Sequence, residues 1–157
     1  MSHEEQIIAK NFYDAAVLFC EKFEFLSNAA YLNPSDLILL IMQIYTAAMH
    51  LPNTEPSTWQ EAEMSIPPAV SFGDWDCYWE IYDPFVLEEP VCGSLADDFS
   101  SIYCGLSKGI HLYEQGHVTD ALWEWRFDFR NHWSFHAVDA IRVLNSLTMG
   151  AEMSPGS

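Results

Sequence analysis

The chain has 157 residues, 23 of them acidic and only 6 of them Lys or Arg, which gives a formal net charge of −17. Half of the residues are hydrophobic and 15% are aromatic. The length suits one domain with an ordinary core, and the aromatic content is too high for an acidic disordered chain. The charge excludes binding of nucleic acid or of an anionic membrane through a broad basic surface.

The compartment expected from the sequence is the cytoplasm. The N-terminus lacks the basic start and apolar stretch of a secretory signal. The longest apolar run, Leu37 to Met49, contains Gln43 and is shorter than the ~20 residues of a spanning helix. The cysteines form no C-x-x-C pair, so we expect reduced and mostly buried thiols rather than a zinc site. They are Cys20, Cys77, Cys92 and Cys104.

Two helices are predicted in residues 1–50. Apolar residues recur in steps of three and four from Ile8 to Ala30, which is one face of a helix. Asn33 can then cap a second helix with Pro34 at its first position, and the apolar pattern continues to about His50. The two segments are expected to form an antiparallel helical hairpin.

Residues 51–93 are predicted to be an irregular, Pro-rich connector with short helices, one of them over residues 58–64. Its aromatic and acidic part lies between Asp74 and Phe85. Helical spacing places four aromatic residues of this part on one face, and Pro84 ends the element. They are Trp75, Tyr78, Trp79 and Tyr82.

A second helical hairpin is predicted over residues 94–149. Ser94 can cap its first helix, Asp97 can reach back as in a capping box, and Gly116 can end it in a left-handed conformation. Residues 123–130 alternate as in a strand, but the absence of a breaker between residues 119 and 147 favours a helix. The fold class predicted is all-α, a single-domain bundle of four main helices over residues 1–149, followed by a mobile tail, 150–157.

His132 and His136 are the strongest candidates for chemistry, because histidines four residues apart on a helix can share one metal ion. A divalent ion there would take a carboxylate from another element, with Asp97 or Asp98 as candidates. Asp128 lies ~12 Å along the helix from His136, so it could only orient His132. Two simpler interpretations stay open. The histidines can be paired with carboxylates or carbonyl groups, and Asp97 and Asp98 can answer the helix dipole.

Other catalytic patterns are absent from the sequence. It contains no H-E-x-x-H, no G-x-S-x-G and no glycine-rich phosphate loop. Arg126 and Arg130 could clamp an anionic ligand, although pairing with the surplus acidic residues is favoured. A non-enzymatic role is therefore preferred.

Residues 78–147 resemble a widespread bacterial family of domains of unknown function. The resemblance is carried by Tyr78-Trp79, Asp83-Pro84-Phe85, Gly93-Ser94-Leu95-Ala96-Asp97-Asp98, Ile102-Tyr103, Trp123-Glu124-Trp125-Arg126-Phe127, His132-Trp133, His136 and Asp139-Ala140. Ser134 and Cys104-Gly105 depart from the pattern. The resemblance implies a mostly helical bacterial protein and brings no activity, cofactor or catalytic residue.

The preferred function is a cytosolic interaction module that presents an acidic, aromatic surface to an unidentified partner protein, with a basic partner favoured by charge. Neither a nucleic acid nor a membrane is expected as partner. No cofactor is expected either, except for the divalent metal ion of the alternative at His132 and His136. That alternative is metal-assisted hydrolysis, and two others are an inhibitor that mimics nucleic-acid charge and a scaffold without a site. Oligomeric state stays open. The predicted interaction surface comprises Trp75, Tyr78, Trp79, Tyr82, Asp83, Phe85 and Arg126.

Overall fold

The computed structural model describes residues 1–29, 31–57 and 61–153, with the backbone alone for residues 150–153. The long helices are α1 (His3–Ser27), α2 (Pro34–Met49), α3 (Leu95–Glu114), α4 (Val118–Asp128) and α5 (Ser134–Met153). A 3-10 turn, η1 (Gly73–Trp75), and two short strands, β1 (Cys77–Glu80) and β2 (Val91–Ser94), precede α3. A π-helical turn, η2 (Phe129–Trp133), joins α4 to α5.

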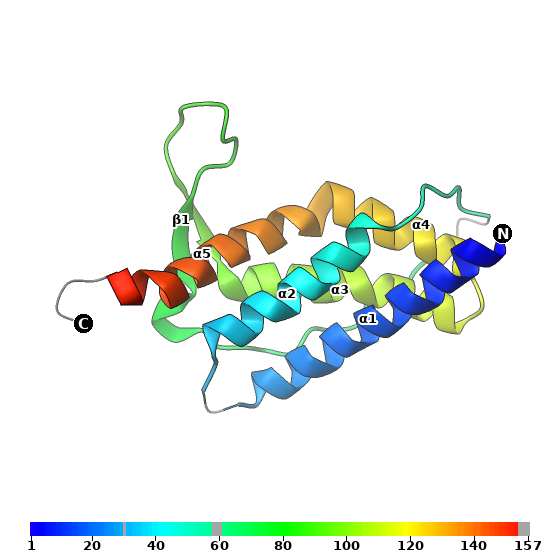
Figure 1. Ribbon diagram of the computed structural model, residues 1–157, viewed down its shortest axis with the longest axis horizontal. Helices are drawn as coiled ribbons and strands as arrows, with labels where there is room; N and C mark the ends of the chain where they lie inside the picture. The colour runs from blue at the N-terminus through cyan, green and yellow to red at the C-terminus, as the bar shows by residue number, and fades with distance from the viewer. Residues whose placement is uncertain (30, 58–60, 154–157) are drawn as a thin grey trace.

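The helices form a bundle in which the two predicted hairpins face each other (Figure 1). Helix α1 packs against α2 and α3, and α5 packs against the same two helices, which closes the arrangement. The prediction of a mostly helical fold is confirmed, with a small β-hairpin as the exception. The described helices include none with both the length and the apolar character that a membrane-spanning segment needs.

Two predicted helix ends have the expected local structure. The Asn33 side chain accepts a hydrogen bond of 2.9 Å from the backbone N–H of Ser35, and Pro34 occupies the first position of α2. Gly116 follows α3 with φ +88°, a left-handed conformation that favours glycine.

The alternating segment 123–130 is helical, as predicted. Its Trp125 and Phe129 are buried while Phe127 is exposed, because residues four apart share a helix face. Trp125 packs against Gly109 of α3 and its Nε1–H donates to the Leu106 carbonyl oxygen at 3.0 Å. The core therefore depends on the close approach of α3 to the consecutive helical elements α4, η2 and α5.

The connector differs from its prediction. Residues 61–64 are not helical, and residues 58–60, the start of the helix predicted there, lie outside the described residues. The prediction of a helix over the aromatic stretch is wrong, because residues 77–80 form the strand β1. This strand pairs with β2 in antiparallel register, with Tyr78 opposite Gly93 and Glu80 opposite Val91. Side chains alternate across a strand, so Tyr78 is half-buried against the bundle while its neighbour Trp79 is exposed.

Two smaller expectations also change. Cys20 is buried as expected, but Cys77 and Cys92 are exposed on the hairpin, and all four thiols are free. The helix α5 continues to Met153, past residue 150 where the tail was predicted to begin, and residues 154–157 lie outside the described residues.

Candidate functional site

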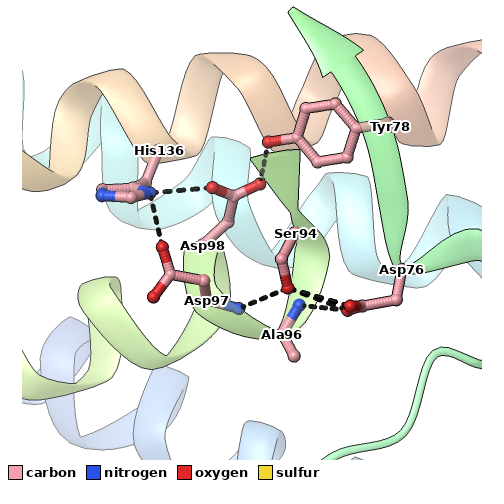
Figure 2. Close-up of polar contacts among 7 residues, drawn as sticks. All are labelled: Asp76, Tyr78, Ser94, Ala96, Asp97, Asp98 and His136. Carbon is pink, nitrogen blue, oxygen red and sulfur yellow. Dashed lines mark hydrogen bonds and ion pairs between the residues drawn. The ribbon is translucent and has the colours of Figure 1, made fainter. Parts of the chain in front are cut away.

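The first turn of α3 is held by two side chains. Ser94 Oγ accepts from the backbone N–H of Asp97 at 3.2 Å, and the Asp76 carboxylate accepts from the backbone N–H of Ala96 at 2.9 Å and from the Ser94 hydroxyl at 3.0 Å (Figure 2). The Ser94 cap is as predicted. Asp76 supplies the additional carboxylate, so the Asp97 side chain does not reach back and instead lies near α5.

Asp97, Asp98 and His136 come together between α3 and α5, and we call them the acid–histidine cluster. His136 Nδ1 lies 2.8 Å from Asp98 Oδ1 and 3.9 Å from Asp97 Oδ2. The Tyr78 hydroxyl donates to the other Asp98 oxygen (Figure 2). One ligand atom from each residue of the cluster lies within 4.8 Å of the others.

Burial and hydrogen bonds shift the pKa values of all three groups that meet at Asp98. Burial raises the pKa of Asp98, while its hydrogen bonds with His136 and Tyr78 act in the opposite direction. The hydrogen bond to Asp98 raises the pKa of His136, which favours the imidazolium. Burial together with the bond to Asp98 raises the pKa of Tyr78, so this phenol stays protonated and acts as a donor.

Of the other two residues of the predicted metal site, His132 lies beside the cluster and Asp128 lies apart from it. His132 is exposed in the π-helical turn, and its ring centroid lies 4.9 Å from that of His136 in an edge-on arrangement. The carboxylate of Asp128 lies 3.9 Å from Lys108 Nζ and against Gly105, both on α3. Asp128 thus lies where α4 contacts α3, and the buried carboxylate beside His136 is that of Asp98.

A groove of about 730 Å³ runs beside the cluster, between the β-hairpin and α5. We call it the hairpin groove. Trp79 and Tyr82 line it from the hairpin, and Phe135 and Val138 line it from α5.

Two acidic residues, Glu80 and Asp139, also line the hairpin groove. Asp139, together with burial, raises the pKa of Glu80 to about 7. The buried Glu80 Oε2 receives no hydrogen bond from the described N–H and O–H groups. Arg142 lines the groove as well, and its Nη2 donates to the backbone carbonyl of Trp79 at 2.6 Å.

The loop between the two strands, residues 81–90, is strongly apolar and exposed, and we call it the apolar loop. The exposed fractions of Tyr82, Phe85 and Leu87 are 86%, 96% and 101%. Asp83 Oδ1 accepts from the backbone N–H of Phe85 at 3.0 Å, so a local turn holds the loop. In Figure 1 the loop projects from the bundle beyond β1.

The predicted interaction surface is therefore divided. Trp79, Tyr82, Asp83 and Phe85 lie on the hairpin, whereas Trp75 and Tyr78 are half-buried and pack on the core. Arg126 lies on α4, a helix that Figure 1 draws away from β1, and donates to Asn53 Oδ1 at 3.2 Å.

Sequence reasoning missed Glu80 and Asp139 as partners. Two spacings could have indicated them: Glu80 stands two residues after Tyr78, and Asp139 three residues after His136.

Residues 4–149 match the model of a family of domains of unknown function. The chain belongs to this family, DUF5063. The match confirms the resemblance seen in the second half of the sequence and extends it to the N-terminal helices.

The fold is similar to that of the crystal structure of protein BF1032 from Bacteroides fragilis, a structural genomics target. The TM-score is 0.66 at 19% sequence identity, and the alignment covers 87% of this chain and 89% of that chain. At this identity the likeness shows the fold alone. The comparison with curated proteins found no match.

Proposed function

We propose that the protein is a non-enzymatic interaction module that binds a basic partner protein through the apolar loop and the hairpin groove. The single observation that carries the proposal is the complete exposure of Phe85 and Leu87 on a hydrogen-bonded hairpin. Exposed apolar patches of this kind are typical of protein interaction sites. Large aromatic and aliphatic side chains on such a surface are the usual anchors of an interface.

Charge supports a basic partner. Residues 74–98, which contain the hairpin, hold eight acidic residues and no Lys, Arg or His. Four of these, Asp74, Glu88, Glu89 and Asp97, are exposed, and their charge steers a cationic protein toward the hairpin and repels an anionic one. The partner is therefore expected to offer a basic segment with apolar side chains that cover the loop.

The test is capture of host proteins by the immobilised full chain, by a double variant of the loop and by a single control variant. Phe85→Ser with Leu87→Ser removes the apolar anchors of the loop, whereas Phe25→Ser removes an aromatic residue that is 78% exposed on α1. A specific partner should be retained by the wild-type chain and by Phe25→Ser and lost with the loop variant. Retention by all three chains would refute the proposal.

The oligomeric state of the purified chain provides a second outcome. If sedimentation shows a dimer that dissociates in the loop variant, the loop is covered by a second copy and the partner-protein proposal is wrong. A monomer in both chains supports it.

A second candidate function is divalent-cation binding, favoured by the convergence of Asp97, Asp98 and His136 within 4.8 Å. Two carboxylates and one imidazole form a donor set suited to zinc or manganese. Such an ion would supply Lewis-acid chemistry at the start of α3. The Asp97 carboxylate, which is 70% exposed, is the ligand most open to an entering ion.

Zinc binding can be measured as a shift in melting temperature. Cys77→Ser and Cys92→Ser should be included, because these exposed thiols could bind zinc themselves. At about 100 times its Kd, zinc should stabilise the chain by about 2.7 kcal/mol. Asp97→Asn should abolish the shift, whereas Asp36→Asn, a first-turn acid of α2, should retain it. If zinc leaves the melting temperature of the chain with Asp97 intact unchanged, this candidate function is eliminated.

A further inference from the structure

We propose that the hairpin groove is a recognition pocket for the guanidinium group of an arginine side chain on the partner protein. The inference rests on the proposed function and specifies which group of the partner protein the groove binds when the partner covers the apolar loop.

The carboxyl groups of the groove provide the first argument. Glu80 from β1 and Asp139 from α5 both line the groove, and Asp139 together with burial raises the pKa of Glu80 to about 7, so two negative charges are unfavourable there. Glu80 Oε2 is buried and lacks a donor among the described groups. A cation in the groove would offset the repulsion between the two carboxyl groups and favour their ionised forms.

The aromatic walls provide the second argument. Trp79 and Phe135 line the groove from opposite elements, and both are largely exposed, at 69% and 65%. An aromatic face attracts a cation placed over it, with Trp the strongest. Carboxyl groups beside exposed rings are therefore the chemistry that recognises an organic cation.

Arg142 of the chain does not supply this cation. Its Nη2 donates to the Trp79 carbonyl oxygen, and its Cζ lies 5.9 Å from the centroid of the Tyr78 ring. Arg142 thus braces β1 against α5. The nearby His136 is paired with Asp98 in the acid–histidine cluster.

The combination of aromatic rings and carboxyl groups in the groove favours guanidinium over ammonium. A planar guanidinium can stack on an indole or phenyl ring while its N–H groups donate to more than one carboxyl oxygen. A lysine ammonium is a compact and strongly hydrated charge that gains less from this combination. The groove, with a volume of about 730 Å³, has room for the group and its alkyl stem.

The probe for the experiment is n-butylguanidinium, with n-butylurea as its neutral counterpart of similar shape. Each is titrated into the isotopically labelled full chain, and the Trp79 indole signal, assigned with Trp79→Phe, is followed by NMR. Butylguanidinium should shift this signal to saturation, and butylurea should bind at least about tenfold more weakly. Equal binding of both probes, or binding of neither, would overturn the proposal.

Matched variants locate the binding. Glu80→Gln keeps the size of the side chain and should weaken butylguanidinium binding by about tenfold. Glu89→Gln removes the same charge from the apolar loop, where Glu89 does not line the groove, and should change the affinity less than about twofold. The buried Trp125 and Trp133 indoles report whether each variant is folded. Equal effects of the two variants would contradict the assignment.

Failure of this proposal and failure of the proposed function can be told apart. The capture experiment depends on Phe85 and Leu87, which do not line the groove. A partner captured through the loop by a chain that ignores butylguanidinium would leave the docking surface in place and refute only the arginine pocket.

Discussion

Asp98 is the residue at which the hairpin, α3 and α5 meet. It is 3% exposed, and its two oxygens are bonded to Tyr78 of β1 and His136 of α5. A buried carboxylate is costly unless such partners compensate for its lost hydration. The acid–histidine cluster therefore ties the candidate site to the bundle whether or not it binds a metal.

Removing the Tyr78 hydroxyl should destabilise the fold. Tyr78→Phe leaves one oxygen of a buried carboxylate without its donor, and hydrogen bonds to charged groups contribute about 1.5–3 kcal/mol. The free energy of unfolding in urea should fall by about that amount. Tyr82→Phe, on the exposed apolar loop, is the control and should change it by less than about 0.5 kcal/mol. Equal stability of the two variants would show that Asp98 does not depend on Tyr78.

The Glu80–Asp139 pair should make stability depend on pH. The pKa of Glu80 is raised from 4.5 to about 7 by Asp139 and by burial, against the opposing charges of His136 and Arg142. An acid whose pKa is raised in the folded state contributes stability that is present below its unfolded pKa and is lost as the pH rises through the folded value. The wild-type chain should therefore lose stability relative to Glu80→Gln between about pH 4.5 and pH 7.

The measurement is the free energy of unfolding of both chains in urea across this pH range. Glu89→Gln serves as the control, because Glu89 is exposed on the apolar loop. Its difference from wild type should stay constant. Parallel curves for wild type and Glu80→Gln would contradict a raised pKa of Glu80 in the folded chain.

At the scale of the elements, two glycines of α3 decide how closely the helices approach. A Cβ on Gly109 would lie 2.1 Å from Trp125 Nε1, and one on Gly105 would lie 2.0 Å from Asp128 Oδ2. Both distances are far below van der Waals contact, and both neighbours are buried. The α3 contact thus requires small residues four apart.

Gly109→Ala should destabilise the chain although alanine is the better helix former. The added methyl group forces Trp125 from its site, and overpacking of a core costs about 1–3 kcal/mol, against a helix-propensity gain of about 1 kcal/mol. We expect a lower melting temperature in calorimetry. Ser100→Ala, a half-buried position of the same helix, gives the baseline for alanine in α3. A melting temperature raised by Gly109→Ala would refute the packing argument.

The helices could be predicted from the sequence because their signals are local. The caps at Asn33 and Ser94, the glycine after α3 and the apolar steps of three and four all lie within a few residues of what they determine. The β-hairpin could not be predicted in this way. Its strands have four residues each, and distant groups hold it in place, such as Asp76 on the first turn of α3 and Tyr78 on Asp98.

The candidate site was predicted in part for the same reason. Asp97, Asp98 and His136 do come together, since α3 packs against α5. The π-helical turn at Phe129–Trp133 changes the helical register just before α5, and the sequence contains no signal for it. Glu80 and Asp139 become neighbours only through the hairpin contact, and the only sequence signals for them are their spacings from Tyr78 and His136.

At the scale of the molecule, the net charge of −17 opposes folding as well as aggregation. The ion pairs of the described residues involve Lys10, Lys108 and His136, which leaves most of the acidic groups without a cation within 4.0 Å. Repulsion among them should be weakened by salt.

Salt should therefore stabilise the isolated chain. Raising sodium chloride from about 20 mM to about 500 mM shortens the screening length several-fold, which should increase the free energy of unfolding in urea. The same addition should weaken the complex with a basic partner, because steering and attraction are screened. A chain that loses stability with salt would show that attractive ion pairs dominate.

The most direct test of the central claim, that the apolar loop and hairpin groove bind a basic protein, is the affinity of the captured and purified partner. Calorimetric titration should give a Kd that rises by about 100-fold or more with Phe85→Ser and Leu87→Ser, since two anchors of a hot spot are lost. Phe25→Ser should leave the Kd within about twofold of wild type. The same Kd for the loop variant and the wild-type chain would contradict the claim.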